Sequence, residues 1–396
     1  MYTETVRIYP NNHQCELIDK TIEDSCTLYN LLLELYTVMY HLIGLRFNKF
    51  GADKYAQIFC KKYNLHLSSI VRKGVIRRLD ESYQRFFKKQ NSYPVHKGLR
   101  KFRSIKSYDA SKTSGCHVFY DTNKIQFVKF GKINANFTRP INGIPKTITI
   151  KKMKSGVYYA FLQIKGDPPQ SKHTNVLNRR PVIAIDLGMN KFITDQFGNY
   201  VGQPRFIEFN EKIIRKEQRK LSRMVKGSNN YLKRCKRLAK LYERVHNIRK
   251  DFHFKLAHFL VTSYDKIICE DLKIRSMISS KTKSRADKKF KRLLLGCAIS
   301  QFLDILTHMS KKYDCQLIKV DPANTSQLCS NCGAMVFKRP GQHHNCPHCG
   351  LVADRDINAA RNIYERGMGQ KYFAGTACNG TPVPLQLVNR VTVPGT

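Results

Sequence analysis

The sequence Val-Ile-Ala-Ile-Asp occupies residues 182–186 and is a continuous apolar run that ends in an acid. Such runs are typical of strands that are buried on both faces of a parallel sheet. A second run of this kind, Ile-Ile-Cys-Glu, occupies residues 267–270. A third strand is predicted over residues 316–320, and helical periodicity separates the three. This half of the chain therefore predicts an α/β domain with acids at the ends of its strands.

A long helical region with one basic face lies between the first two strands. Its apolar positions step by three and four residues, which predicts core or coiled-coil packing. Residues 211–250 contain 15 Lys and Arg against three acids, and this excess indicates contact with backbone phosphates. Another helix is predicted at about 286–312. The apolar stripe of the long region consists of Leu238, Leu241, Val245, Ile248, Phe252, Leu256 and Phe259.

The N-terminal half starts with a short predicted strand at residues 4–9 and then becomes helical. Apolar spacing predicts one long helix at about 12–43 and a second at about 67–90. The second helix is crowded with Lys and Arg and has few acids. Such charges usually form only a solvated helix face. Here the shortage of opposite charge favours contact with nucleic acid.

Residues 115–165 alternate with a period of two, which predicts strands at 124–130, 147–151 and 157–164. Lys154-Ser155-Gly156 is a hairpin turn signal between the last two strands. Together they predict a small antiparallel barrel or sheet. If the strand at 4–9 belongs to it, the helices between are an insertion. The Pro-Pro segment within 167–180 predicts a linker.

The composition indicates a polyanionic partner. The chain has 396 residues, 70 Lys and Arg against 29 Asp and Glu, and a net charge of +41. This length predicts two or three domains, and a hydrophobic fraction of 42% disfavours a disordered chain. A folded protein this basic repels itself unless a polyanion such as nucleic acid neutralises it. Charge alone also fits a ribosomal-type or cationic surface protein.

The sequence predicts neither a membrane span nor a signal peptide. It contains no uncharged apolar stretch of about 18 residues, and the N-terminus lacks a basic segment followed by an apolar core. Nine of the 13 Cys are scattered singly. This usage suits a reducing cytosol with one metal site better than a disulfide framework. We therefore expect a cytoplasmic protein. The compact length favours a prokaryote, in which so basic a chain would be nucleoid-associated.

The other four cysteines form two Cys-x-x-Cys pairs. These are Cys329 with Cys332 and Cys346 with Cys349, and a glycine follows each pair. Four thiolates that converge on one ion, with no open position, predict a structural Zn²⁺. A pair of redox dithiols is the alternative, but it would not need two matched knuckles. The nearby His343, His344 and His348 could replace a cysteine, although ordinary loop histidines or histidines that face nucleic acid are the simpler interpretation.

Acids at the ends of predicted strands and at the predicted start of a helix indicate a metal site. Asp186 and Glu270 end buried strands, and Asp354 and Asp356 follow the second knuckle at the predicted start of a helix. Taken singly, each acid is best explained as a strand-end or helix N-cap, Asp354 above all. Together, in so basic a chain, they predict a site for two Mg²⁺ that hydrolyses a phosphodiester.

These motifs also carry a resemblance to a known family. Ile-Asp-Leu-Gly-Met-Asn-Lys-Phe (185–192) resembles the first motif of RuvC-type nuclease domains, and Ile-Cys-Glu-Asp-Leu-Lys-Ile-Arg-Ser-Met (268–277) resembles the second. Thr-Ser-Gln-Leu-Cys-Ser-Asn-Cys-Gly (325–333) and Asp-Arg-Asp-Ile-Asn-Ala-Ala-Arg-Asn-Ile (354–363) resemble the zinc ribbon and third motif of TnpB. TnpB is a transposon-encoded, RNA-guided DNA endonuclease related to type V CRISPR effectors. The C-terminal half matches these motifs closely. The N-terminal half matches in the order of its predicted parts, which are a strand, a helical insertion and a small barrel.

The resemblance implies an α/β RNase H-like (RuvC) nuclease domain with a zinc ribbon, plus an N-terminal β-barrel that carries a helical insertion. It implies Asp186, Glu270 and Asp356 as catalytic residues that bind Mg²⁺. It also implies a guide RNA derived from the transposon end, and target double-stranded DNA with a short adjacent motif. A monomer with one RNA is expected, with a dimer as the alternative. The rival functions are a non-cleaving RNA-guided regulator and a transposase-associated DNA-binding protein.

The resemblance also implies domain boundaries. We expect a wedge-like β-barrel domain, a helical recognition domain, a nuclease domain, the zinc ribbon and a mobile tail. The barrel domain covers 1–10 and 105–170, and the helical domain covers 11–104. The nuclease domain covers 180–328 and 350–369, the zinc ribbon 329–349 and the tail 370–396.

Overall fold

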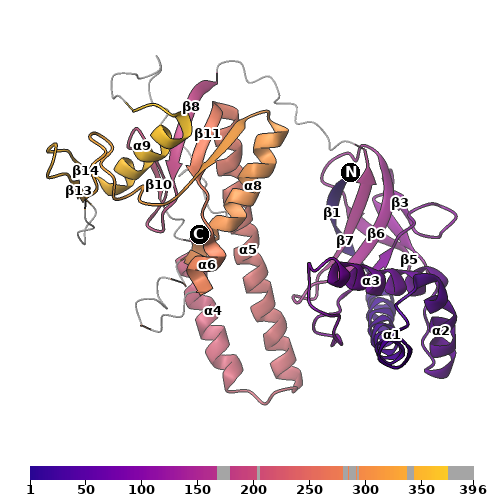
Figure 1. Ribbon diagram of the computed structural model, residues 1–396. Helices are drawn as coiled ribbons and strands as arrows, with labels where there is room; N and C mark the ends of the chain where they lie inside the picture. Colours follow the sequence, from indigo (N-terminus) through magenta and orange to yellow (C-terminus); the bar gives the residue numbers. More distant parts are fainter. Residues whose placement is uncertain are drawn as a thin grey trace. The chain divides into compact units, whose positions relative to one another are not determined.

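The structure is a computed structural model, in which the chain divides into two compact units, Met1–Ser171 and Lys172–Thr396 (Figure 1). No helix in its described ranges combines the length and the apolar character that a membrane crossing requires. Residues 373–396 of the predicted tail and most of the predicted linker lie outside those ranges. The structure describes residues 1–166, 179–202, 206–279, 284, 291, 294–336 and 343–372.

The first unit contains a seven-stranded antiparallel sheet in the order β2-β6-β7-β1-β5-β4-β3. β1 pairs with β5 and with β7, so it belongs to the same sheet as the later strands. The helices between β1 and β2 are therefore an insertion between two strands of one sheet, as predicted. A closed barrel would need a pairing between the edge strands β2 and β3, and the described residues contain none. The strands are β1 (Tyr2–Tyr9), β2 (Ser104–Ser107), β3 (His117–Phe119), β4 (Lys124–Phe127), β5 (Gly131–Asn136), β6 (Ile144–Lys152) and β7 (Tyr158–Lys165).

Two of the three helices of this unit pack on the sheet, and the other one packs on those two helices. α1 (Asn12–Ile43) starts at a capping box in which Asn11 and Gln14 exchange hydrogen bonds, and it ends at Gly44 in the left-handed conformation. α2 (Lys49–Lys62), which the sequence did not predict, precedes α3 (Ser69–Phe87). A Cβ at Gly74 of α3 would lie 2.1 Å from the Lys106 carbonyl oxygen. Only glycine therefore allows this approach of α3 to β2.

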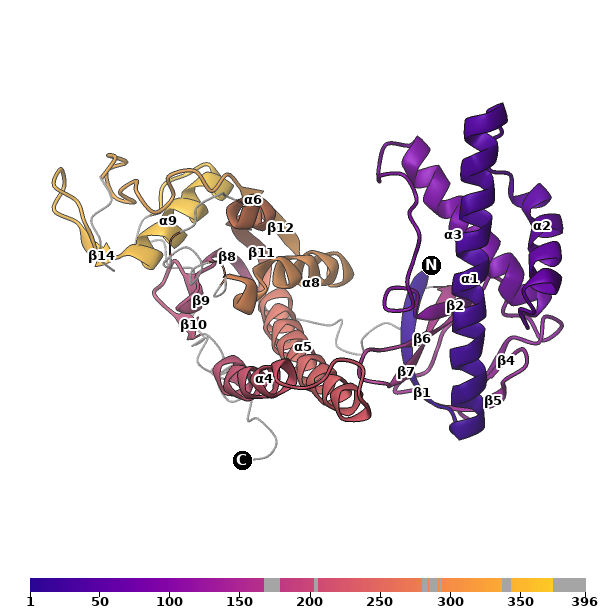
Figure 2. The ribbon, with the colours of Figure 1, turned by 90° about the horizontal axis from the view of Figure 1, so that it is seen from below.

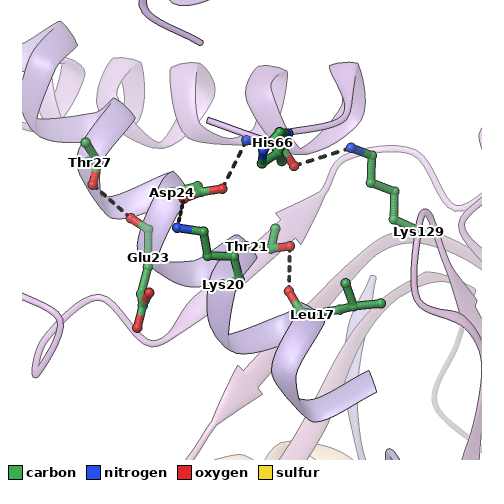
Figure 3. A network of polar contacts seen from close by, with 8 residues as sticks. All are labelled: Leu17, Lys20, Thr21, Glu23, Asp24, Thr27, His66 and Lys129. Atoms are coloured by element: carbon green, nitrogen blue, oxygen red, sulfur yellow. Dashed lines mark hydrogen bonds and ion pairs between the residues drawn. The ribbon is translucent and has the colours of Figure 1, made fainter. Parts of the chain in front are cut away.

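A buried acid ties α1 to the loop before α3 (Figure 3). Asp24 is 3% exposed, and its Oδ2 accepts a hydrogen bond from the His66 backbone N–H at 3.0 Å. Lys20 Nζ lies 3.3 Å from Asp24 Oδ1 one turn earlier on the helix. Lys129, in the turn between β4 and β5, donates to the His66 carbonyl at 3.3 Å. The network joins α1, the loop and the sheet, because a buried carboxylate is tolerated only when it is paired.

The second unit has a five-stranded sheet in the order β10-β9-β8-β11-β12. The three predicted strands are the parallel strands β8, β11 and β12, whereas β9 and β10 add an antiparallel hairpin. This hairpin was not predicted from the sequence. The signal for it was Gly198, which lies in the turn between the two strands with a φ of +94°. The strands are β8 (Arg180–Asp186), β9 (Lys191–Asp195), β10 (Tyr200–Gly202), β11 (Tyr264–Glu270) and β12 (Gln316–Val320).

Helices cover both faces of this sheet (Figures 1 and 2). Residues of α5 and α8 share one core with Ile183, Ile185 and Ile267, whereas Ile363 of α9 packs against Ala184 and Ile268 on the opposite face. The helices are α4 (Phe206–Ser222), α5 (Asn229–Ser263), α6 (Ile274–Ser279), α8 (Ile299–Lys312) and α9 (Arg355–Met368).

Two helix predictions need correction. The basic region at 211–250 is not one helix but two, because a turn with Gly227 at φ +91° separates α4 from α5. Ser228 then caps α5 by accepting from the Tyr231 N–H. The helix predicted at 286–312 is interrupted at Ala298, whose φ of +49° places it in the left-handed region. α8 starts only after this residue, and 285–290 lie outside the described residues.

Candidate active site and cysteine cluster

Asp186 and Glu270 end two neighbouring parallel strands. β8 and β11 pair with Ile185 opposite Cys269, and the two acids are the next residues of these strands. Carboxyl ends of parallel strands meet at one edge of a sheet, which is where α/β proteins place their sites. Glu270 also pairs with Val320 of β12. The fold therefore brings these two predicted acids to the same sheet edge.

α9 brings the third acid to this edge. Asp354 is the N-cap of α9, and its Oδ1 accepts a hydrogen bond from the Asp356 N–H at 2.9 Å. Its Oδ2 accepts a hydrogen bond from Lys191 Nζ at 2.7 Å. Asp354 is thus occupied by the cap and an ion pair, whereas Asp356 lines a cavity together with Asp186 and Glu270.

This cavity has a volume of about 1020 Å³ and lies within the second unit. Besides these three acids, its charged lining consists of Asp271, Asp321, Lys273, Lys319 and Arg355. Arg355 Nη2 lies 3.4 Å from Asp356 Oδ1. A cavity lined by both carboxylates and cations suits a phosphate group accompanied by divalent metal.

Negative charge is crowded at the sheet edge. Burial, together with the charges of Glu270 and Asp356, raises the pKa of Asp186 to about 8, against an opposing effect of Arg355. Burial also raises the pKa of Glu270, while a hydrogen bond from Thr325 acts in the other direction. For Asp354, burial is outweighed by its hydrogen bonds with Lys191 and the Asp356 N–H, so its pKa is lowered.

The chemistry of these acids fits magnesium. Carboxylate oxygens are the ligands that Mg²⁺ prefers, and a divalent cation would neutralise the crowded charge that raises the Asp186 pKa. The three carboxylates do not form a tight group. In the part of the chain that the structure describes, only the four cysteines have ligand atoms that all lie within 4.8 Å of one another.

Cys329, Cys332, Cys346 and Cys349 come together as the spacing predicted. Their sulfur atoms lie 3.6 Å apart in the pairs Cys329–Cys349 and Cys332–Cys346, and none is in a disulfide. Gly333 and Gly350 adopt φ values of +78° and +72°, the left-handed turn that each knuckle requires. The short strands β13 (His343–Asn345) and β14 (Val352–Asp354) then lead to α9.

The thiols differ in environment. Hydrogen bonds from Asn331 and the Leu351 N–H lower the pKa of Cys349 to about 6, whereas burial raises the pKa of Cys329. A four-cysteine cluster of this geometry is compatible with structural zinc, which would hold all four as thiolates. His343 and His344 are in strand β13 rather than a loop, and His344 is buried.

Sequence reasoning missed three residues that the fold places beside the acids. Thr325 donates to Glu270, Lys191 pairs with Asp354, and Arg355 contacts Asp356. Lys191 and Arg355 lie within the motifs at 185–192 and 354–363, so a positive charge beside the acids was visible in the sequence. The contact of Thr325 with Glu270 joins residues 55 apart in the chain and has no local signature.

Two family patterns match parts of the chain between residues 163 and 363. The family OrfB_IS605, described as "Probable transposase", matches residues 163–281. The "Cas12f1-like, TNB domain" matches residues 300–363. The first range contains Asp186 and Glu270, and the second contains the four cysteines and Asp356.

Similar proteins extend the match over most of the chain. A "Putative RNA-guided DNA endonuclease" of Streptomyces pristinaespiralis is 25% identical over 94% of this chain and 89% of its own length. The "Putative RNA-guided DNA endonuclease InsQ" of Escherichia coli is 26% identical over 74% of this chain and 73% of its own length. "TnpB-like protein L79" of Acanthamoeba polyphaga mimivirus is 28% identical over 70% of this chain but only 54% of its own length. These matches confirm the resemblance to the TnpB family.

Two solved structures are similar at low identity. A Cas12f1–sgRNA–target DNA complex is 18% identical, covers 91% of this chain and 98% of its own, and has a TM-score of 0.35. CasPhi-2 (Cas12j) bound to crRNA is 9% identical, and the match covers 92% of this chain and 97% of its own chain with a TM-score of 0.43. Both scores lie below 0.5, so neither match supports a conclusion about this chain.

Proposed function

We propose that this chain, a relative of the TnpB family, is an RNA-guided DNA endonuclease. The observation that carries the proposal is the meeting of Asp186, Glu270 and Asp356 at one cavity beside a four-cysteine cluster. The relatives named RNA-guided DNA endonucleases support the substrate class. The net charge of +41 supports two nucleic-acid partners, a guide RNA from the transposon end and target double-stranded DNA.

The catalytic residues would be Asp186, Glu270 and Asp356, and the same carboxylates would hold Mg²⁺. When bound, the metal would supply an activated water and stabilise the leaving oxygen of the phosphodiester. The protein would contribute the fixed orientation of Asp186 and Glu270 at their strand ends. Arg355, Lys273 and Lys319 in the cavity wall would attract and orient the phosphate backbone.

Base pairing with the guide would read the DNA sequence, while the protein reads duplex shape and a short flanking motif. We assign the RNase H-like fold to the second unit, with Zn²⁺ at the cysteine cluster. The first unit would be the wedge-like domain with its helical insertion, and it would grip the RNA and the heteroduplex. The working particle would be a monomer with one RNA.

The first prediction is that Asp186→Asn lowers the cleavage rate by about 10³-fold or more, because a carboxylate that holds the metal is lost. The measurement is single-turnover cleavage of a plasmid target by protein purified with the RNA from its native locus. Binding of guide RNA and of target DNA should stay within twofold of wild type. Sequencing the co-purified RNA should give a defined transposon-end transcript.

Asp354→Asn and Asp356→Asn are the matched controls. Asp356→Asn should abolish cleavage, whereas Asp354→Asn removes a cap charge and should keep the rate within about tenfold. The reverse result would show that the third acid is misassigned. A wild-type protein that binds guide and target without cutting would favour a regulator, and RNA-independent cutting would favour a transposase that acts directly on DNA.

A further inference from the structure

A buried hydroxyl holds the carboxylate of Glu270. Thr325 is 3% exposed and Glu270 is 7% exposed. Thr325 Oγ1 donates a hydrogen bond to Glu270 Oε1 at 2.5 Å. The Pro322 carbonyl oxygen, the other acceptor near this hydroxyl, lies at 3.3 Å. A hydroxyl has one proton to donate, and the shorter contact places it on the carboxylate.

Two buried amides of α9 hold the segment that carries Thr325. Asn362 Nδ2 donates to the carbonyl oxygens of Thr325 and Leu328, each at 2.7 Å. Asn358 Nδ2 also donates to the Leu328 carbonyl at 2.7 Å, and Asn358 Oδ1 accepts from the Ser330 N–H at 2.9 Å. Asn358 and Asn362 are 0% and 5% exposed. Burying amides costs free energy unless they are hydrogen-bonded, and these bonds satisfy that need while fixing the loop.

The same helix therefore controls two of the three acids. α9 carries Asp356 in its first turn, and through Asn362 it fixes the backbone of Thr325, which in turn holds Glu270. The segment continues directly into Cys329, the first residue of the cysteine cluster, and Ser330 is bonded to Asn358. The positions of Glu270, Asp356 and the first knuckle are thus linked by hydrogen bonds between buried groups.

We propose that Thr325 is a positioning residue that orients Glu270 for metal binding, with Asn362 holding Thr325 in place. The inference rests on the proposed function, in which Glu270 binds the metal. Holding Oε1 stops the carboxylate from rotating about its last bond, so its remaining lone pairs point in a fixed direction. Hydrogen-bonding partners behind a metal ligand commonly change metal affinity or activity by about 10–100-fold when they are removed.

The test compares Thr325→Val, which replaces the hydroxyl by a methyl group of similar size, with Thr325→Ser, which keeps the hydroxyl. Thr307→Val is the matched control, because Thr307 is in the same unit and donates only to the Leu303 carbonyl of its own helix. Mn²⁺ binding to the RNA-bound protein is measured by electron paramagnetic resonance, and cleavage by single-turnover kinetics. Zinc content is measured by elemental analysis.

Thr325→Val should weaken Mn²⁺ binding and slow cleavage, each by about 10–100-fold. Thr325→Ser should recover both to within about threefold of wild type, and Thr307→Val should change neither. Zinc content and DNA affinity should stay as in wild type for all three variants, which a general loss of structure would not allow. If circular dichroism shows that Thr325→Val is unfolded, Thr325→Ala removes the same hydroxyl without a new methyl group against the carboxylate.

The outcomes separate this proposal from the proposed function. Equal Mn²⁺ affinity in wild type and the hydroxyl-free variant would overturn the positioning role, whatever the cleavage result. A second outcome is that the hydroxyl-free variant binds Mn²⁺ more weakly while the wild-type protein never cuts DNA. That outcome would uphold the positioning role of Thr325 and contradict the proposed nuclease activity. A Thr325→Ser variant as defective as Thr325→Val would also overturn the proposal, because the hydroxyl would then not be the cause.

Discussion

His253 is a buried titratable side chain in the core of the second unit. It is 1% exposed and stacks on Phe192, with ring centroids 5.3 Å apart and planes 12° apart. Phe302 contacts the same ring edge-on at 5.7 Å. Burial, reinforced by the nearby charge of Arg249, lowers the pKa of His253 to about 4. The imidazole is therefore neutral in the folded protein over a range in which an exposed histidine is charged.

This shift predicts acid sensitivity. Well above pH 6.5, His253 is neutral in both the folded and the unfolded chain, so it adds no pH dependence there. Between pH 6.5 and about 4 the unfolded chain takes up a proton that the folded chain does not, so the free energy of unfolding falls as pH falls. The loss from this one group is up to about 3 kcal/mol.

The measurement is chemical denaturation of wild type and His253→Gln at pH 7.5, 6.0 and 5.0. The variant, which cannot be protonated, should lose less stability between pH 7.5 and 5.0 than wild type. Equal pH slopes in the two proteins would show that His253 does not cause the acid loss.

Helix α4 carries a stripe of cations along one side. They recur at steps of three and one, the spacing of a single helix face, and line one groove of the surface. Glu217, the acid within this stretch, is turned away and buried, where its Oε2 accepts from Arg234 of α5 at 2.7 Å. Arg215 Nη2 lies 3.0 Å from Glu211 Oε1, and the rest of the stripe is left without an acid partner among the described residues. Its members are Lys212, Arg215, Lys216, Arg219, Lys220 and Arg223.

The α4 stripe predicts contact with the phosphate backbone. Replacing Lys216 and Lys220 by Gln should weaken nucleic-acid binding and lower the magnitude of the slope of log K against log salt by roughly 2, since each phosphate contact contributes about 0.9. The effect should be similar across DNA sequences, because phosphate contacts carry no sequence information. Binding is measured by fluorescence anisotropy at several salt concentrations.

The control for the α4 stripe is the double variant Lys311→Gln with Lys312→Gln. It removes the same charge from the exposed end of α8. An equal drop in slope for both double variants would mean that net charge, rather than the stripe, sets the salt dependence.

At the scale of the whole molecule, each unit has its own buried core. One cluster of apolar side chains joins the first sheet to α1, α2 and α3, and two further clusters lie on the faces of the second sheet. The candidate active site and the cysteine cluster both belong to the second unit. Loss of zinc should therefore disturb the second unit through its own hydrogen bonds and leave the first unit's core intact.

Cys329→Ser tests this prediction. Zinc content should fall to less than half of the wild-type value, because one of four thiolates is lost. Hydrogen exchange should accelerate in residues 325–336 and at the start of α9, which Ser330 and Asn358 connect. Peptides from α1 and α3 should exchange as in wild type. Cys60→Ser in α2 is the control, and unchanged zinc in Cys329→Ser would contradict the assignment of the cluster.

Much of the candidate site could be predicted from local patterns. The apolar runs that end in Asp186 and Glu270 are strands β8 and β11, and the predicted third strand has the bounds of β12. The cysteine spacing identified all four members of the cluster. The long helix predicted at 12–43 is α1. These features depend on periodicity, turn residues and ligand spacing, which short segments of chain contain in full.

The sequence alone therefore determined the chemistry: which acids end strands, which thiols can share an ion, and a charge that calls for a polyanion. The tertiary structure decided which of those groups meet. It used Asp354 as a helix cap paired with Lys191, brought Asp356 to the cavity, and placed Thr325 on Glu270. Those contacts join side chains that are far apart in the chain, and only packing of the sheet, α9 and the cysteine-bearing loop brings them within hydrogen-bonding distance.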